Sequence, residues 1–480
     1  MTKCIAIRDR IQAPERSRVK EEQIEFNFGS GPKPKIVFDA EHITSDTGLV
    51  ALRQVDERFG LTAMAAKQIV DGRWQPMVVH PVERLVREAV YGYAAGYEDA
   101  NDHTPLRNDP VYGKIIGPIH KTSINPKKQE GLASEATLSR LLGRRKLDVG
   151  EVFDDTHVDQ FVRVMEEAPP RFITLDVDGY DAETYGMQQL TLFNGFYEQQ
   201  MYYPLHVSVA EYGWICAVRI RPGNASAGED AVEVLGRIIA KFRAAWPKLR
   251  IRVRGDSGFA SPKLYEACEA WNVEYVIRMR KNEVLQRLLT RLAKQRQTDE
   301  PDAWEDGRAV VYYEGRYKAK GWGKWRRVIF KMTCDMDRYG EDEVYVLVTN
   351  LRKAPKKAWT IYAHRGQEEQ RIEEFKNDLR GEKLSCSDMA DNGMKLQLQA
   401  MAHNLFAAVR IGLPENHELK RATVGRLRLV LVKCGAMVKQ TARQMWLHAS
   451  RHFPYRHHVM EVSQMALAPQ WRPTPLWGSG

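Results

Sequence analysis

Residues 171–178, Arg-Phe-Ile-Thr-Leu-Asp-Val-Asp, mark the point where the chain changes from a helical to a strand-like pattern. Their branched and aromatic side chains predict a β-strand, and Gly179 permits a turn directly after it. Three further runs of this kind follow, at 189–193, 204–209 and 215–220. The sequence therefore predicts a group of strands joined by short turns, with Asp178 closing the first strand.

The next segment alternates helices with strands. Ser226-Ala-Gly-Glu229 is a capping box, which predicts the start of a helix. A strand at 250–255, a helix at 261–271 and a strand at 273–280 follow. Antiparallel strands followed by a helix–strand–helix–strand order are expected of an RNase H-like α/β core, which we predict for residues 166–283.

The regions on either side of this core differ from it in pattern. Residues 284–350 are rich in aromatic, basic and β-forming residues and predict an inserted β-domain. Residues 351–385 predict a helix that returns to the core. The helical pattern and basic charge predict two helical DNA-binding regions, at residues 37–165 and 386–480. The polar composition of residues 1–36 predicts a flexible basic lead-in.

Charge and composition limit the classes of function. Lys and Arg number 72 against 62 Asp and Glu, and this net charge of +10 suits a polyanionic partner such as DNA. The six cysteines show no Cys-x-x-Cys spacing, which argues against a zinc ribbon and a disulfide framework. We find no secretory signal and no apolar run of membrane-spanning length. We therefore expect a cytoplasmic protein without a membrane partner.

Two basic segments predict contacts with DNA. Between Lys420 and His458 the chain carries many Lys and Arg residues and no acid. We expect DNA contacts there from Lys433, Lys439 and Arg443. His448 and His452 in the same segment predict phosphate contacts or no role, because no third metal ligand is near in sequence.

Residues 131–146 predict a short helix capped by Ser134 with a basic end. It is either the second helix of a helix-turn-helix motif or a solvated helix whose cations favour the C-terminal dipole.

Residues 362–376, Tyr-Ala-His-Arg-Gly-Gln-Glu-Glu-Gln-Arg-Ile-Glu-Glu-Phe-Lys, predict a helix. With about 100° of rotation per residue, four polar side chains share one arc of about 60°. These are Tyr362, Arg365, Glu369 and Lys376. The alternative is an exposed helix face with weak Arg–Glu pairs four residues apart.

Three carboxylates in this order could bind metal. Asp178 and Asp256 each follow or end a predicted strand, and Glu369 lies on the predicted helix. A single aspartate at a strand end most often caps a turn. Three acids that converge on one point can instead hold two hard cations through oxygen ligands and support phosphoryl transfer.

The same residues carry a resemblance to a known family. Tyr362-x2-Arg365-x3-Glu369-x6-Lys376 is similar to the Y-R-E-K signature of bacterial insertion-sequence DDE transposases. Arg254-Gly-Asp-Ser-Gly-Phe259 resembles their second-aspartate motif, and Leu175-Asp-Val-Asp178 their first. Blocks at 96–102, 106–110 and 132–140 resemble the thirteen-eighty insertion-sequence family. The resemblance runs from about residue 36 to 460.

The resemblance implies a role for each matching residue. Asp178, Asp256 and Glu369 would form the catalytic and metal-binding triad, holding two Mg²⁺ ions for which Mn²⁺ can substitute. Tyr362, Arg365 and Lys376 would hold the transposon end near the cleaved phosphate. An aromatic residue of the inserted domain, Trp322 or Trp325, would stack on a displaced base.

One position departs from the family pattern. Tyr180 stands two residues after Asp178, where the family usually has Thr or Ser. Asp176 and Glu373 are therefore kept as alternatives for the first and third acid.

The predicted function is DNA transposition. The protein would bind terminal inverted repeats, cleave DNA with a metal cofactor, and transfer the strand to target DNA as a homodimer in a synaptic complex. The alternative is a transposase-derived DNA-binding protein without activity, which would lack one of the three acids.

Overall fold

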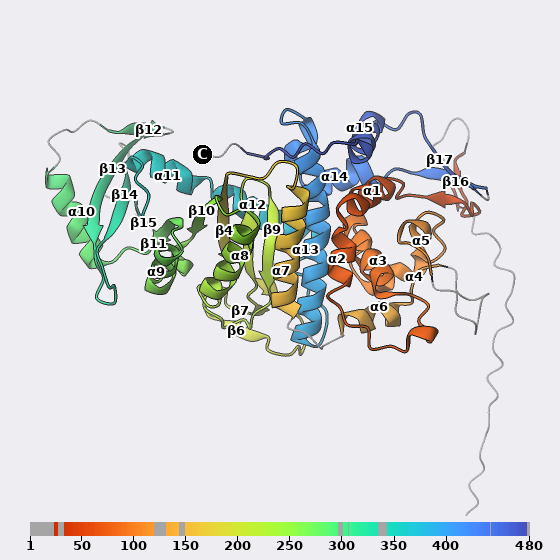
Figure 1. Ribbon diagram of the computed structural model, residues 1–480, viewed down its shortest axis with the longest axis horizontal. Coiled ribbons are helices and arrows are strands. Elements are labelled where there is room, and N and C mark those ends of the chain that lie inside the picture. The colour runs from red at the N-terminus through yellow and green to blue at the C-terminus, as the bar shows by residue number, and fades with distance from the viewer. Residues whose placement is uncertain are drawn as a thin grey trace, which may run out of the picture.

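The computed structural model describes residues 24–26, 33–119, 131–143, 149–295, 301–305, 307–334, 343–441 and 443–477. Figure 1 shows an elongated molecule with helices at the N-terminal side, a central sheet, and a β-rich extension at the far end. Most of the predicted lead-in lies outside the described residues, although Ile24–Glu25 (β1) pairs with Lys35–Ile36 (β2). None of the described helices is both long and apolar enough to cross a membrane.

The N-terminal region is helical, as predicted. Its main helices are α1 (Leu49–Phe59), α2 (Leu61–Ala66), α3 (Val82–Ala95), α6 (Glu135–Leu142) and α7 (Val149–Val164). Gly60 separates α1 from α2 with a φ of 65°, a conformation that favours glycine. Helix α6 follows Ser134 and buries Leu138 and Leu141, whereas the basic end predicted for it lies outside the described residues.

Five strands, with β9 at the edge, form one end of a large mixed sheet. They are β4 (Phe172–Gly179), β8 (Leu205–Val209), β9 (Trp214–Arg219), β10 (Arg250–Gly255) and β11 (Glu274–Met279). Their order in space is β9-β8-β4-β10-β11. Strand β8 runs antiparallel to both of its neighbours, β9 and β4, whereas β10 runs parallel to β4 and to β11. The parallel strands are joined through α8 (Ala231–Ala245) and α9 (Pro262–Ala270), in the predicted order.

One predicted strand does not belong to this sheet. The run at 189–193 is mostly loop, and β6 begins only at Leu192. This short strand (Leu192–Asn194) joins β5 (Ala182–Glu183) and β7 (Gln199–Tyr202) in a separate three-stranded sheet below the core sheet in Figure 1.

Residues 284–350 are β-rich as expected, but they extend the core sheet and do not form a sheet of their own. After α10 (Glu283–Gln295), the strands are β12 (Ala303–Glu305), β13 (Arg308–Tyr317), β14 (Arg326–Cys334) and β15 (Glu343–Thr349). Strand β15 pairs antiparallel with β11, which gives nine strands in all. This pairing covers the edge of β11 that would otherwise expose unpaired backbone groups.

The segment that carries the signature residues is two helices, and the prediction of a single helix was wrong. Helix α11 (Pro355–Ala363) ends before Arg365, and α12 (Gly366–Leu379) begins after it. The two helices have different packing partners, which explains the break. Helix α11 packs against β11, β13 and β14, whereas α12 packs against α13 (Met389–Gly412) and α14 (Val424–Leu427).

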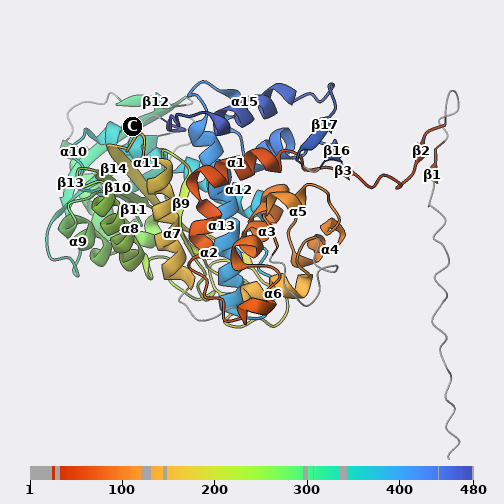
Figure 2. The same ribbon diagram turned by 45° about the vertical axis from the view of Figure 1, so that its right-hand side comes forward.

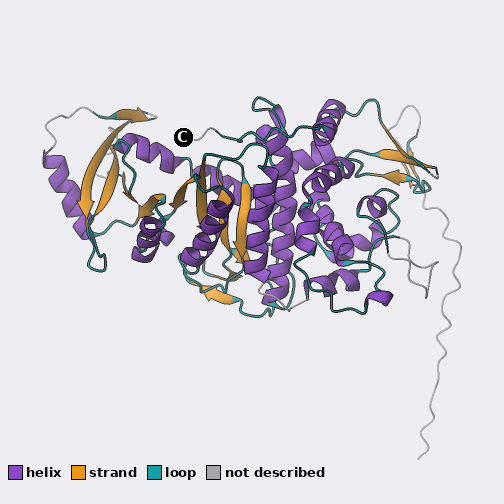
Figure 3. Ribbon diagram, in the orientation of Figure 1, coloured by secondary structure: helices purple, strands orange, loops and turns teal. Residues whose placement is uncertain are grey.

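Helix α13 is the central support of the molecule. It packs against α3 on one side and against α7 and β9 on the other, and nearly all of it is buried. In Figure 3 it stands between the strands of the core sheet and the N-terminal helices.

The C-terminal region is not wholly helical as predicted. After a 3-10 turn, η4 (Glu418–Arg421), and α14, a hairpin of β16 (Ala436–Gln440) and β17 (Met445–Ala449) precedes α15 (Arg456–Leu467). Strand β16 also pairs with β3 (Ile43–Thr44), near the start of the chain (Figure 2). This long-range pairing gives the hairpin a third strand and explains why the basic segment is not a helix.

Candidate active site

Two aspartates on β4 point to the same face of the sheet, because side chains alternate along a strand. Asp176 lies opposite Ser208 of β8, and Asp178 lies opposite His206. Asp176 is 1% exposed in the middle of the strand, whereas Asp178 is 9% exposed near its end. The strand thus carries one acid deep in the molecule and one at the rim of the sheet.

Asp176 belongs to a tight ion pair. Arg254 of β10 donates to both of its carboxylate oxygens, from Nε and Nη2, at 2.6 Å each. The third nitrogen, Nη1, donates to the backbone oxygen of Ile361 at 2.7 Å. Both partners are buried, so this bidentate pair joins β4, β10 and α11 inside the molecule.

Asp256 follows β10 and lies beside Asp178. In the parallel pair, Gly255 is opposite Val177, so the next residues along each strand are also neighbours. Asp256 caps the short η3 turn (Ser257–Phe259), with Oδ1 accepting the Gly258 N–H at 2.9 Å. Its Oδ2 forms no hydrogen bond or ion pair with the described part of the chain. The expected turn cap is therefore present and leaves one oxygen available.

Neighbouring glutamates on α12 have opposite environments. Glu368 is fully buried; Ser208 Oγ donates to its Oε2 at 2.6 Å, and His206 Nδ1 lies 2.9 Å from its Oε1. Glu369 is exposed and, within the described part of the chain, pairs only with Arg365. The step of about 100° between consecutive helical residues turns one side chain into the sheet and the next toward solvent.

These residues fall into two named groups. The carboxylate site is Asp178, Asp256 and Glu369. The buried ionic layer beneath it is Asp176, Arg254, His206, Ser208, Glu368 and Arg371. Arg371 belongs to this layer because its Nη1 donates to Glu368 Oε2 at 3.2 Å.

Arg365 connects the acids of the carboxylate site. Its guanidinium forms ion pairs with Asp178 and with Glu369. Burial raises the pKa of Asp178 to about 7; Arg365 opposes this rise and the negative charge of Asp256 adds to it. Burial alone would lower the pKa of Arg365, but the nearby acids, Asp178 first, outweigh it and raise the pKa. The site is thus a coupled cluster of negative charges held by one cation.

A cavity of about 400 Å³ opens beside these acids. Asp178 and Glu369 line it, together with Asp181, Glu373 and Lys376. Lys376 Nζ donates to Asp181 Oδ1 at 2.9 Å and lies 3.5 Å from Glu382 Oε2. The cavity is therefore strongly polar, with acids and one lysine from β4, α12 and the adjoining loops.

The carboxylate site can supply only oxygen ligands, which suit hard divalent cations. Among the described residues, its three acids do not form a group whose ligand atoms all lie within 4.8 Å of one another. Asp178 lies between the other two, beside Asp256 and joined to Glu369 through Arg365. Three acids so placed offer oxygen ligands for divalent cations.

The three aromatic residues predicted to contact DNA differ in solvent exposure. Tyr362 is 9% exposed and packs against Trp359, with ring centroids 5.6 Å apart. Trp322 is 6% exposed and makes edge contacts with Tyr265 and Tyr317. Trp325 is 57% exposed. Of the two tryptophans, only Trp325 is thus accessible for stacking, and Trp322 packs in the core.

The three basic residues predicted to contact DNA also differ in exposure and in their ion pairs. Lys433 Nζ forms a 2.7 Å ion pair with the buried Asp46 and lies 4.3 Å from the Tyr97 ring centroid. Lys439 and Arg443 are exposed on the β16–β17 hairpin. Two of the three cations can therefore reach a partner without breaking an internal ion pair.

The sequence did not point to Asp181, although it lines the cavity and binds Lys376. Its position three residues after Asp178 was the available signal. Tyr180, the residue that departs from the family pattern, is 3% exposed and donates from its hydroxyl to Gly381 O at 3.1 Å. This tyrosine ties the end of β4 to the end of α12.

Comparison with known proteins was made on sequence and on structure. The family model described as "Transposase DDE domain group 1" matches residues 26–469. A search of curated proteins finds no match. Among solved structures, the chain is similar to the cryo-EM structure of a piggyBac transposase synaptic complex with hairpin DNA. That similarity has 12% identity and a TM-score of 0.36 over 87% of this chain and 85% of that chain.

Proposed function

The chain belongs to the transposase DDE domain family, and from that premise we propose that it cleaves DNA at transposon ends and transfers the freed strand to a target. Membership in this family implies a nuclease or transferase that uses a divalent metal. The finer proposal is an insertion-sequence transposase, of the thirteen-eighty family, that recognises inverted repeats and pairs two ends as a homodimer. The signature residues Tyr362, Arg365, Glu369 and Lys376 support it.

The fold we propose for the catalytic part is RNase H-like. The support is the spatial order β9-β8-β4-β10-β11, in which three antiparallel strands precede two parallel strands joined through helices. The parallel pairing of β4 and β10 brings their carboxyl ends to one edge, as is usual for ligand sites in such sheets.

The observation that carries the proposal is the meeting of three acids from distant parts of the sequence. Asp178 and Asp256 end neighbouring strands, and Arg365 connects Asp178 to Glu369 from α12. We assign the first acid to Asp178 because it lines the cavity near the end of β4, whereas Asp176 is 1% exposed and holds Arg254 with both oxygens. We assign the third to Glu369, since it reaches Asp178 through Arg365, and Glu373 remains an alternative on the cavity wall.

The donor set of the carboxylate site fits Mg²⁺, with Mn²⁺ as its substitute. All candidate ligands are carboxylate oxygens, and Oδ2 of Asp256 is not engaged by the described residues. When bound, two such ions activate an attacking oxygen and stabilise the leaving oxygen of a phosphodiester. The Asp256 cap on η3 fixes the position of that ligand before any ion binds.

Arg365 and Lys376 are proposed to hold the phosphate backbone. Arg365 Nε is buried and has no hydrogen-bond partner among the described residues, so it offers an unused donor. Lys376 lines the same cavity as Asp178 and Glu369. A guanidinium and an ammonium beside a cluster of acids would place a phosphate next to the metal ligands.

The alternative is a transposase-derived DNA-binding protein without catalytic activity. It would have the same fold and basic surface but lack a member of the carboxylate site. All three acids are present in this chain; Asp178 and Glu369 line one cavity, and Asp256 follows the strand that pairs with β4. This favours an active enzyme.

The test is cleavage of a duplex that carries the element's end, with Mg²⁺, by wild-type protein and by Asp256→Asn. Asparagine can still accept the Gly258 N–H, so the turn cap and the fold should remain. We expect cleavage to fall by roughly 10³-fold while end binding stays within about twofold.

Asp109→Asn is a matched control. Asp109 also caps a turn, accepting the N–H groups of Val111 and Tyr112 at 2.9 and 2.8 Å, but it lies in the N-terminal region. Cleavage by Asp256→Asn within tenfold of wild type would remove Asp256 from the site.

A further inference from the structure

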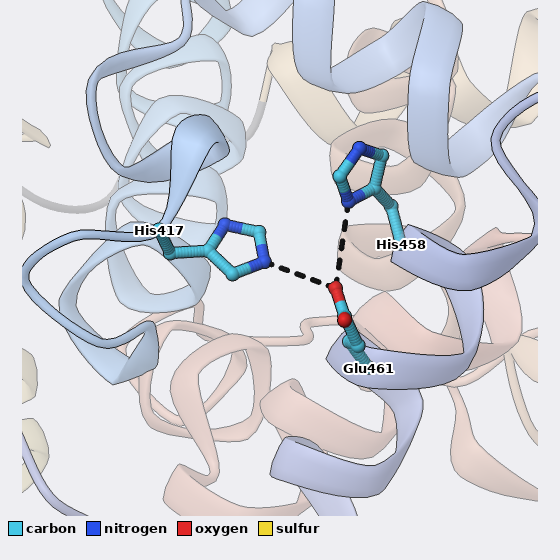
Figure 4. A group of neighbouring side chains, drawn as sticks. All are labelled: His417, His458 and Glu461. Atoms are coloured by element: carbon cyan, nitrogen blue, oxygen red, sulfur yellow. Dashed lines mark hydrogen bonds and ion pairs between the residues drawn. The ribbon is translucent and has the colours of Figure 1, made fainter.

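A cluster of His and Glu side chains near the C-terminus takes no part in the proposed function. His417 precedes η4, and His458 and Glu461 lie on α15. His417 Nε2 is 3.1 Å from Glu461 Oε2, and His458 Nδ1 is 3.5 Å from the same oxygen (Figure 4). The three ligand atoms lie within 4.8 Å of one another. They thus converge more tightly than the acids of the carboxylate site.

His458 has the environment of a metal-binding imidazole. It is 3% exposed, and its Nε2 forms an ion pair with Glu418. Because a carboxylate only accepts hydrogen bonds, the Nε2 atom carries a hydrogen, which leaves Nδ1 as the nitrogen that can bind a metal. Nδ1 is buried and has no hydrogen-bond partner among the described residues. A carboxylate behind a histidine in this way fixes the ring and its tautomer for a metal.

His417 has a second role in the free protein. Its Nδ1 accepts the Leu419 N–H at 3.1 Å and caps η4, so Nε2 carries the hydrogen that faces Glu461. A metal bound at Nε2 moves this hydrogen to Nδ1, and the cap bond to Leu419 is exchanged for a metal bond. Binding should therefore change the first turn of η4 as well as join it to α15.

We propose that His417, His458 and Glu461 form a zinc site. Two imidazole nitrogens and one carboxylate oxygen are a donor set typical of Zn²⁺ and unlike the all-oxygen set of the carboxylate site. His417 and Glu461 also line a cavity of about 1000 Å³, which leaves room for water as the fourth ligand. This site is independent of the proposed transposase activity.

The position of the site suggests what the ion does for the protein. His417 lies three residues before the acid-free basic segment that contains the β16–β17 hairpin, and His458 ends that segment. A metal bond between these two histidines closes the segment into a loop and reduces the freedom of the unfolded chain. Zn²⁺ should thus hold α15 and the hairpin in place on the body of the protein.

A second group shares one ligand with this site. Glu418, His457 and His458 also bring three ligand atoms within 4.8 Å. In that arrangement Glu418 and His457 are both exposed, and the bond between Glu418 and His458 Nε2 would be lost. We therefore place the ion on the Nδ1 side of His458.

The experiment is calorimetric titration of the chelator-treated, full-length protein with Zn²⁺ in excess Mg²⁺, which occupies oxygen-only sites. We expect one Zn²⁺ per chain, a rise in the melting temperature, and visible absorption when Co²⁺ replaces Zn²⁺. Glu461→Gln and His417→Gln should each weaken Zn²⁺ binding at least tenfold. Both positions are more exposed than His458, so the variants should fold.

The matched control is the double variant His448→Gln/His452→Gln. These two histidines are exposed in and after the hairpin and should not affect Zn²⁺ binding. The proposal is overturned if Zn²⁺ does not bind, if Glu461→Gln and His417→Gln bind it as tightly as wild type, or if the control loses it. Loss of binding in His457→Gln without loss in Glu461→Gln would also overturn it, because the ion would then belong to the second group.

Discussion

The carboxylate site and the buried ionic layer beneath it use the same residue types in opposite ways. In the layer, each acid is saturated: Asp176 has both oxygens on Arg254, and Glu368 is bonded by Ser208 and paired with His206. In the site, Asp256 keeps an unengaged oxygen and Glu369 is exposed. Asp178 accepts the Gly179 N–H and pairs with Arg365, but it lines the cavity. The acids of the layer join elements inside the molecule, whereas those of the site lie where a ligand can approach.

This difference arises over very short distances in the sequence. Only Val177 lies between Asp176 and Asp178 on β4, and Glu368 and Glu369 are consecutive residues of α12. The layer also positions the site, because Arg254 ties β4 to the end of α11, and Glu368 ties α12 to β8. We infer that a substitution in the layer should act on stability and one in the site on activity.

The largest contrast between loss of activity and loss of stability is expected for Asp178→Asn and Asp176→Asn. Asp178→Asn removes a proposed metal ligand, so cleavage of the end duplex should fall by roughly 10³-fold with little change in the free energy of unfolding. Asp176→Asn leaves the buried Arg254 without its charge partner and should cost about 3–5 kcal/mol of stability. Urea unfolding and a cleavage assay on both variants measure the contrast.

A double variant, Asp176→Asn with Arg254→Gln, sharpens this test. It removes both charges of the pair and should recover part of the stability lost by Asp176→Asn alone. Equal loss of stability in Asp178→Asn and Asp176→Asn would show that both aspartates belong to one structural network.

A smaller contrast of the same kind is expected between substitutions of Glu368 and of Glu369. Glu369→Gln should lower cleavage and leave stability almost unchanged, because the side chain is exposed. Burial opposes ionisation of Glu368, but bonds from His206 and the charge of Arg371 lower its pKa from 4.5 to about 2. A lowered pKa stabilises the fold at pH values above 4.5, and this contribution is lost progressively as the pH falls below 4.5.

Unfolding of wild type and Glu368→Gln at pH 7 and pH 3 checks this pH dependence. The stability difference between the two proteins should be larger at pH 7, since at pH 3 part of the wild-type contribution is already lost. A difference that does not change with pH would mean that Glu368 acts through packing and not through its charge.

Much of the core could be predicted from local patterns. The strand-forming run before Asp178 and the helix-forming run before β11 lie where the structure has β4 and α9. The capping box at 226–229 forms a turn, in which Glu229 accepts the Ser226 N–H, and α8 begins after it at Ala231. These signals work because each element forms from its own residues. The order of strands and helices followed from them.

The remaining features of the fold and of the sites depend on contacts between residues that are far apart in the sequence. The hairpin at β16–β17 pairs with β3, almost 400 residues earlier in the chain by the numbering. The break between α11 and α12 reflects different packing partners for the two helices. Likewise, nothing local separates Trp322 from Trp325, and the buried position of Trp322 comes from Tyr265 and Tyr317. The His417 cluster also joins residues from two elements.

The smallest expected effect concerns the basic residues of the C-terminal segment, which also divide into paired and exposed side chains. Lys433 is paired with the buried Asp46, as the acids of the layer are paired, whereas Lys439 and Arg443 are exposed on the hairpin. If the hairpin lies on DNA, each lost phosphate contact should lower the slope of log K against log salt by about 0.9. Lys439→Gln with Arg443→Gln should therefore lower it by about 1.8, equally for end and random duplexes, because phosphates carry no sequence information.

Lys433→Gln should leave the slope unchanged and reduce stability instead, because Asp46 loses its partner. Titrations at several salt concentrations measure the slopes. An unchanged slope in the double variant would place the DNA on the β-rich extension or the N-terminal helices and leave the hairpin with a structural role.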